Sequence, residues 1–134
     1  MTMHAQINTK SVHTYLALGD SYTIGESVAE ADRYPIQLVR RLNEVGYSIS
    51  NPKIIAKTGW TTDELMAAIV QEHMEDQTFD MVSLLIGVNN QYRGRDVEVY
   101  RKEFTELVSM AVKFARNNVN NVFVVSIPDW GMTP

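Results

Sequence analysis

Three segments of this chain carry residue types that together could catalyse the transfer of an acyl group. Ser21 follows the apolar run at positions 15–18, while Gly59 and Asn89 follow two later apolar runs. A serine hydroxyl attacks a carbonyl carbon when a neighbouring base removes its proton. A glycine amide and an asparagine side chain can donate hydrogen bonds to the oxyanion that this attack forms, and one such donor contributes about 100- to 1000-fold to the rate.

Each segment also has a simpler interpretation on its own. The Gly-Asp-Ser triplet that ends at Ser21 is typical of a turn, and Gly59 fits a turn between Thr58 and Trp60. Asn89 fits a loop, because asparagine tolerates turn conformations. Their occurrence in this order, each after its own apolar run, favours a common site.

The elements that must position these residues alternate between strand and helix. The pattern predicts strands at 14–18, 48–56, 81–86 and 122–127, and helices at 34–45, 61–74 and 97–117. Thr61 and Glu64 form a capping-box pattern at the start of the second helix. Pro52 favours an edge position for the second strand, because proline cannot donate a ladder hydrogen bond.

This alternation predicts an α/β fold with a parallel sheet covered by helices on both faces. Right-handed crossovers then bring every strand-to-helix loop to the same edge of the sheet. Ser21, Gly59, Asn89 and Asp129 belong to the loops after the four strands in turn. We therefore expect these four residues to lie along one edge.

Composition excludes several classes of function. The net charge of −4 argues against a nucleic-acid-binding protein, and no apolar run reaches the length of a membrane span. Cysteine is absent, which excludes a disulfide framework, a thiol nucleophile and a thiolate metal site. The polar start lacks the apolar core of a signal peptide and favours a cytoplasmic location, although a removed leader is equally compatible with it.

Four segments resemble the sequence blocks of a known superfamily. They are Ala17–Glu26, Ala56–Thr62, Ile86–Tyr92 and Ile127–Gly131. With these blocks the chain resembles the SGNH hydrolases, the superfamily of GDSL-type esterases and lipases, from about Thr14 to its last residue. The first block is the most specific, and the second would be weak alone.

The resemblance implies a three-layer α/β/α domain with a flavodoxin-like, mostly parallel sheet. It implies that Ser21 is the nucleophile, and that its amide, the amide of Gly59 and the side chain of Asn89 form the oxyanion hole. The expected reaction is hydrolysis of a small-molecule carboxylic ester through an acyl-serine intermediate, without a metal or organic cofactor.

Further residues near these blocks are candidates for contact with the substrate: Asp20, Trp60, Asn90, Asp129 and Trp130. The aromatic residues could instead pack over the loops, and Asp129 could be a turn residue. Asn90 stands where the superfamily usually has aspartate. Arg93 and Arg95 could meet a charged substrate, but a solvated face is the simpler interpretation.

The chain departs from the superfamily in lacking its last block, an Asp-x-x-His motif that supplies the base. No histidine follows His73. His13 precedes the first strand and is expected about 20 Å from Ser21. His73 is expected near the same edge of the sheet as His13, opposite to Ser21, and His4 lies in a polar tail. We interpret 14–134 as the N-terminal portion of one SGNH hydrolase domain that lacks the last strand and helix, preceded by the polar tail 1–13.

Two functions follow from this comparison. One is a serine ester hydrolase that is active when the domain is complete, and the other is a catalytically silent binding or assembly module. A nucleotide-binding protein fits poorly, because no glycine-rich phosphate-binding motif is present. The fourth strand, at 122–125, is expected to be an exposed sheet edge through which the chain self-associates.

Overall fold

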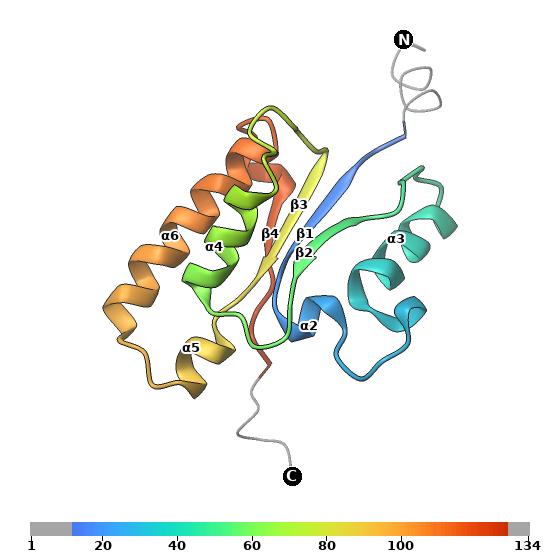
Figure 1. Ribbon diagram of the computed structural model, residues 1–134. Helices are drawn as coiled ribbons and strands as arrows, with labels where there is room; N and C mark the ends of the chain where they lie inside the picture. The colour runs from blue at the N-terminus through green and yellow to red at the C-terminus, as the bar shows by residue number, and fades with distance from the viewer. Residues whose placement is uncertain (1–11, 129–134) are drawn as a thin grey trace.

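The computed structural model describes residues 12–128 of the 134-residue chain. Four strands alternate with helices along the chain (Figure 1). The strands are β1 (Tyr15–Gly19), β2 (Lys53–Ala56), β3 (Met81–Leu85) and β4 (Val122–Val124). The helices are α2 (Ser21–Ile24), α3 (Tyr34–Glu44), α4 (Thr62–Gln71), α5 (Val88–Tyr92) and α6 (Val97–Phe114), with 3₁₀ turns η1 (Glu30–Asp32) and η2 (Val119–Asn121).

The strands form one sheet in the order β2-β1-β3-β4, and all neighbouring strands are parallel. This confirms the predicted parallel sheet and the edge position of β2. The second strand is shorter than predicted, since regular pairing begins at Lys53, directly after Pro52. Upstream of it, Ile49 makes only an isolated bridge to His13.

Helices cover both faces of the sheet, which confirms the predicted α/β/α layers. Helices α4 and α6 lie on one face and α3 on the other (Figure 1). Strand β1 contributes side chains to the cores on both faces of the sheet, because successive residues of a strand point to opposite faces. Leu16 and Leu18 belong to the core under α4 and α6, whereas Tyr15 and Ala17 pack with Val39 of α3.

The helices predicted at 61–74 and 97–117 were each a few residues too long, for a common reason. Helix α4 ends at Gln71, and His73 has a φ of 51°. Helix α6 ends at Phe114, because Arg116 and Asn117 have φ values of 57° and 62°. A left-handed residue cannot continue a right-handed helix.

Between residues 12 and 128, no helix is both long and apolar enough to cross a membrane.

Strand β4 is the outer strand of the sheet on the side away from β2. Its side chains are poorly covered, with Phe123 44% and Val124 55% exposed. Regular pairing stops at Val124, earlier than predicted, although the Val125 amide still donates to the Leu84 carbonyl at 2.9 Å. The predicted tail up to residue 11, including His4, lies outside the described residues, as do Asp129 and Trp130.

Candidate active site

The sheet topology brings the loops after β1, β2 and β3 to one edge. Strand β1 lies between β2 and β3, so Ser21 is flanked by the loops that contain Gly59 and Asn89. The chain moves from β1 to one side for β2 and to the other side for β3, which makes this a topological switch point. Ligands of open α/β sheets bind in the crevice at such a point, beyond the carboxyl ends of the strands.

Ser21 is the first residue of α2, a single helical turn that the sequence did not predict. Asp20 caps this helix by accepting a hydrogen bond from the Tyr22 amide at 3.0 Å. Gly19 leaves no room for a side chain, because a Cβ there would lie 2.0 Å from Thr23 Oγ1. The amide of a first helical residue has no partner inside the helix, so the Ser21 amide is suited to bind an incoming oxygen.

Asp20 itself is buried, and its burial raises the pKa of the carboxyl group. One carboxylate oxygen caps α2, and Oδ2 has no hydrogen-bond partner within the described part of the chain. Its observed role is therefore to hold the turn that presents Ser21. A contact between Asp20 and the substrate stays a prediction.

Gly59 lies at the third position of a turn closed by a hydrogen bond from the Trp60 amide to the Lys57 carbonyl, at 3.3 Å. Its φ of 89° matches the third position of a type II turn, which favours glycine. The Thr58 hydroxyl donates a hydrogen bond to the Glu26 carboxylate. This bond joins the Gly59 loop to the loop that follows Ser21.

Asn89 lies in α5, a second short helix that the sequence did not predict. Its side-chain amide donates a hydrogen bond to the Trp60 carbonyl at 3.0 Å. A primary amide carries two N–H donors, so this bond fixes the orientation of the group and leaves the second donor for a ligand. The bond also ties the loop after β3 to the loop after β2.

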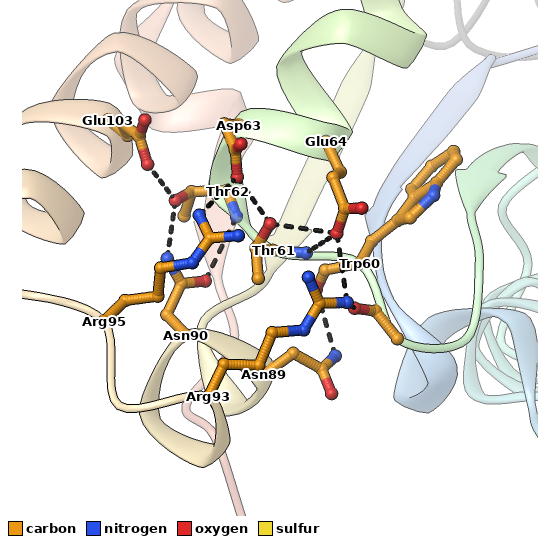
Figure 2. A network of polar contacts seen from close by, with 11 residues as sticks. Trp60, Thr61, Thr62, Asp63, Glu64, Asn89, Asn90, Arg93, Arg95 and Glu103 are labelled. Carbon is orange, nitrogen blue, oxygen red and sulfur yellow. Dashed lines mark hydrogen bonds and ion pairs between the residues drawn. The ribbon is translucent and has the colours of Figure 1, made fainter.

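Asn90 is only 3% exposed and joins α5 to the first turn of α4 (Figure 2). Its Oδ1 accepts from the Thr62 amide at 3.1 Å, and its Nδ2 donates to the Thr62 hydroxyl at 2.8 Å. The Thr62 hydroxyl in turn donates to Glu103 at 2.6 Å. This chain of bonds uses a group that both accepts and donates, which an amide provides and a carboxylate does not.

Arg93 and Arg95 form ion pairs at the start of α4, so they are more than a solvated face (Figure 2). Arg93 lies 3.3 Å from Glu64 and Arg95 lies 3.1 Å from Asp63. Arg93 also donates a hydrogen bond to the Gly59 carbonyl at 2.5 Å. The sequence showed these charges but held no signal for their partners.

Trp60 is partly buried and packs against the core between the sheet and α4. Packing, which was one of the two interpretations open from the sequence, is therefore part of its role. A hollow of about 230 Å³ adjoins the nucleophile candidate, with Ser21, Glu26 and Arg33 among its lining residues.

Neither His13 nor His73 lies where it could accept the proton of Ser21. His13 precedes β1 and lies 3.7 Å from Asp80, so it belongs to the amino-terminal edge of the sheet. His73 is exposed beyond the end of α4, where that helix has returned to the same edge. No three His, Asp or Glu side chains within residues 12–128 form a group that could hold a metal ion.

Comparison with known proteins gives one family match and several structural matches. The model of the GDSL-like Lipase/Acylhydrolase family matches residues 17–134. AlinE4, an SGNH-hydrolase family esterase, superposes with a TM-score of 0.66 at 21% identity, over 85% of this chain and 58% of its own. TesA has a TM-score of 0.68 at 22% identity, over 90% of this chain and 64% of its own.

Axe2, an acetylxylan esterase from Geobacillus stearothermophilus, matches with a TM-score of 0.53 at 22% identity, over 85% of this chain and 59% of its own. No curated protein matches the chain. The chain therefore spans 58–64% of the length of these three solved structures.

Proposed function

Because the chain belongs to the GDSL-like lipase/acylhydrolase family, we propose that it supplies the nucleophile and oxyanion hole of a serine ester hydrolase. The observation that carries this proposal is the convergence of three loops on one edge of the sheet. Ser21, Gly59 and Asn89 come from these loops, and the bond from Asn89 to the Trp60 carbonyl leaves one amide hydrogen free to donate.

In the proposed reaction, Ser21 Oγ attacks the ester carbonyl carbon and its proton passes to a base. The carbonyl oxygen becomes an oxyanion that accepts hydrogen bonds from the Ser21 amide, the Gly59 amide and the Asn89 side chain. Collapse of this intermediate expels the alcohol and leaves an acyl-serine, which water then hydrolyses. None of the described histidines lies beside Ser21, so the base that we propose is an imidazole outside residues 12–128, as the resemblance to the Asp-x-x-His families implies.

Small esters are the substrates that we propose. The hollow beside Ser21 has a volume of about 230 Å³ and includes the charged residues Glu26 and Arg33. An acetyl or similarly short acyl group fits such a space, and acetyl is the acyl group in the substrate that Axe2 is named for. A long apolar chain would have to lie against charged groups, which costs free energy.

The test is hydrolysis of p-nitrophenyl acetate by the 134-residue chain and by its Ser21→Ala variant. Turnover that disappears in the variant supports the nucleophile and means that a base reaches Ser21. Equal rates contradict catalysis by this chain and favour the second candidate, a silent binding module. The absence of an imidazole beside Ser21 within residues 12–128 is the observation that favours that alternative.

A further inference from the structure

The proposed oxyanion hole depends on the position of the Gly59 amide, and the backbone of the turn around Gly59 is conformationally flexible. Glycine has more backbone freedom than any other residue. Because of this freedom, a shift of the Gly59 Cα within the loop would move its N–H relative to Ser21.

One side chain holds this turn from the outside. Arg93 Nη2 donates to the Gly59 carbonyl at 2.5 Å and lies 3.3 Å from Glu64 Oε1 (Figure 2). Glu64 is in turn fixed by the Thr61 amide and the Thr61 hydroxyl, each at 3.0 Å. The Arg93 guanidinium is therefore anchored to the capping box of α4, and it binds the Gly59 carbonyl from that fixed position.

We propose that Arg93 is a positioning residue that holds Gly59 in the conformation needed for its amide to act as an oxyanion-hole donor, an inference that rests on the proposed function. The carbonyl that Arg93 binds and the N–H of Gly59 share the Gly59 Cα. Fixing this carbonyl anchors the peptide that follows Gly59 and so limits displacement of the Cα from which the N–H projects. Arginine suits this task because its planar fork can bind two oxygens at once.

Arg95 provides a matched control for this role. Both arginines follow α5, and each forms an ion pair with a carboxylate of the first turn of α4. Their side chains are similarly exposed, at 40% for Arg93 and 36% for Arg95. Only Arg93 also binds the Gly59 carbonyl, so the two variants differ in the contact that the proposal concerns.

The experiment compares the 134-residue chain with its Arg93→Gln, Arg93→Lys and Arg95→Gln variants. Backbone ¹⁵N relaxation reports the order parameter of the Gly59 amide, and thermal unfolding confirms that each variant is folded. We expect the Gly59 order parameter to fall from about 0.85 toward 0.6 in Arg93→Gln, to recover in part in Arg93→Lys, and to stay unchanged in Arg95→Gln. The Trp60 amide signal should shift in Arg93→Gln, because it belongs to the peptide that loses its hydrogen bond.

Ester hydrolysis is measured on the same four proteins. We expect kcat to fall about tenfold to 100-fold in Arg93→Gln with little change in KM, since misplacement of a catalytic group by 1 Å can cost about 100-fold. Unaltered Gly59 and Trp60 signals in Arg93→Gln, or equal changes in Arg95→Gln, would overturn the inference. If none of the four proteins hydrolyses the ester, catalysis by this chain is contradicted while the relaxation data still decide the role of Arg93.

Discussion

Gly19 and Gly59 exclude a side chain for different physical reasons. At Gly19 the cause is crowding, because a Cβ would lie 2.7 Å from the Leu85 carbonyl oxygen as well as against Thr23. At Gly59 the space is open, since a Cβ there would lie 3.8 Å from its nearest neighbour, Arg93 Nη2, and the backbone φ of 89° is the cause. A substitution at Gly59 therefore tests the backbone conformation alone.

We predict that Gly59→Ala destabilises the fold by about 1 kcal/mol, the cost of a left-handed conformation for a residue with a Cβ. We also predict that it lowers kcat by about 100- to 1000-fold, because the turn relaxes and its amide leaves the oxyanion hole. Urea unfolding and ester hydrolysis measure the two effects.

Gly46→Ala is the control for this prediction. Gly46 also has a positive φ, of 106°, and open space where a Cβ would stand, but it follows α3 far from the three loops. It should lose similar stability and keep its activity. An equal loss of activity in both variants would contradict a specific role for the Gly59 amide.

The sequence could identify the neighbours Asn89 and Asn90 as a pair but could not separate their roles. Both amides follow β3, and the difference lies in what surrounds them. Asn89 binds the Trp60 carbonyl with one donor, whereas Asn90 is buried and uses both ends of its amide on Thr62. Such partners come from another loop, and the sequence pattern carries no information on how two loops meet.

At the scale of elements, the first turn of α4 is the junction of the site. The capping box of Thr61 and Glu64 was predicted from a local spacing and is confirmed. The bonds from Asn90, Arg93 and Arg95 to the same turn were beyond prediction, because they depend on the tertiary placement of α5. The short helices α2 and α5 were also missed, since four or five residues are too few to show a helical period.

This junction should respond to acid. The Thr61 amide, more than any other group, lowers the pKa of Glu64, and the Arg93 charge lowers it further. A lowered pKa means that the unfolded state binds more protons, so the stabilisation is complete above the unfolded pKa of about 4.3 and is lost as the pH falls through the lower folded pKa.

We therefore predict that Glu64→Gln is less stable than the wild type at pH 7, by less than about 1 kcal/mol because the pair is half-exposed. The difference should shrink as the pH falls below about 4. Urea unfolding at several pH values measures it, with Glu106→Gln, at an exposed position of α6, as the control. A difference that is independent of pH would contradict the assigned role of the Glu64 charge.

At the scale of the whole molecule, the alternation of strands and helices was sufficient to predict the layers, the parallel sheet and the common edge of Ser21, Gly59 and Asn89. These follow from general rules of handedness and connection. The sequence also predicted that the fourth strand would be exposed, and β4 is the outer strand of the described sheet.

Strand β4 presents both backbone and apolar groups to its surroundings. The Val125 amide donates to β3, so by alternation the backbone groups of Val124 point away from β3. The Val124 side chain is 55% exposed and that of Phe123 is 44% exposed. Unpaired edges of this kind pair readily with another strand.

We propose that β4 of the 134-residue chain pairs with β4 of a second copy, antiparallel to it, as a two-fold symmetric contact requires.

Sedimentation velocity over a concentration series tests this pairing. We predict that the chain sediments above its monomer mass of 15.2 kDa as the concentration rises, and that Val124→Lys keeps it near that mass. A lysine on an edge strand blocks pairing by placing a charge where a second strand must approach. Val45→Lys is the control, because Val45 is 71% exposed at the end of α3, remote from β4. A wild-type chain that stays monomeric at high concentration, or the same effect from both lysines, would refute pairing through β4.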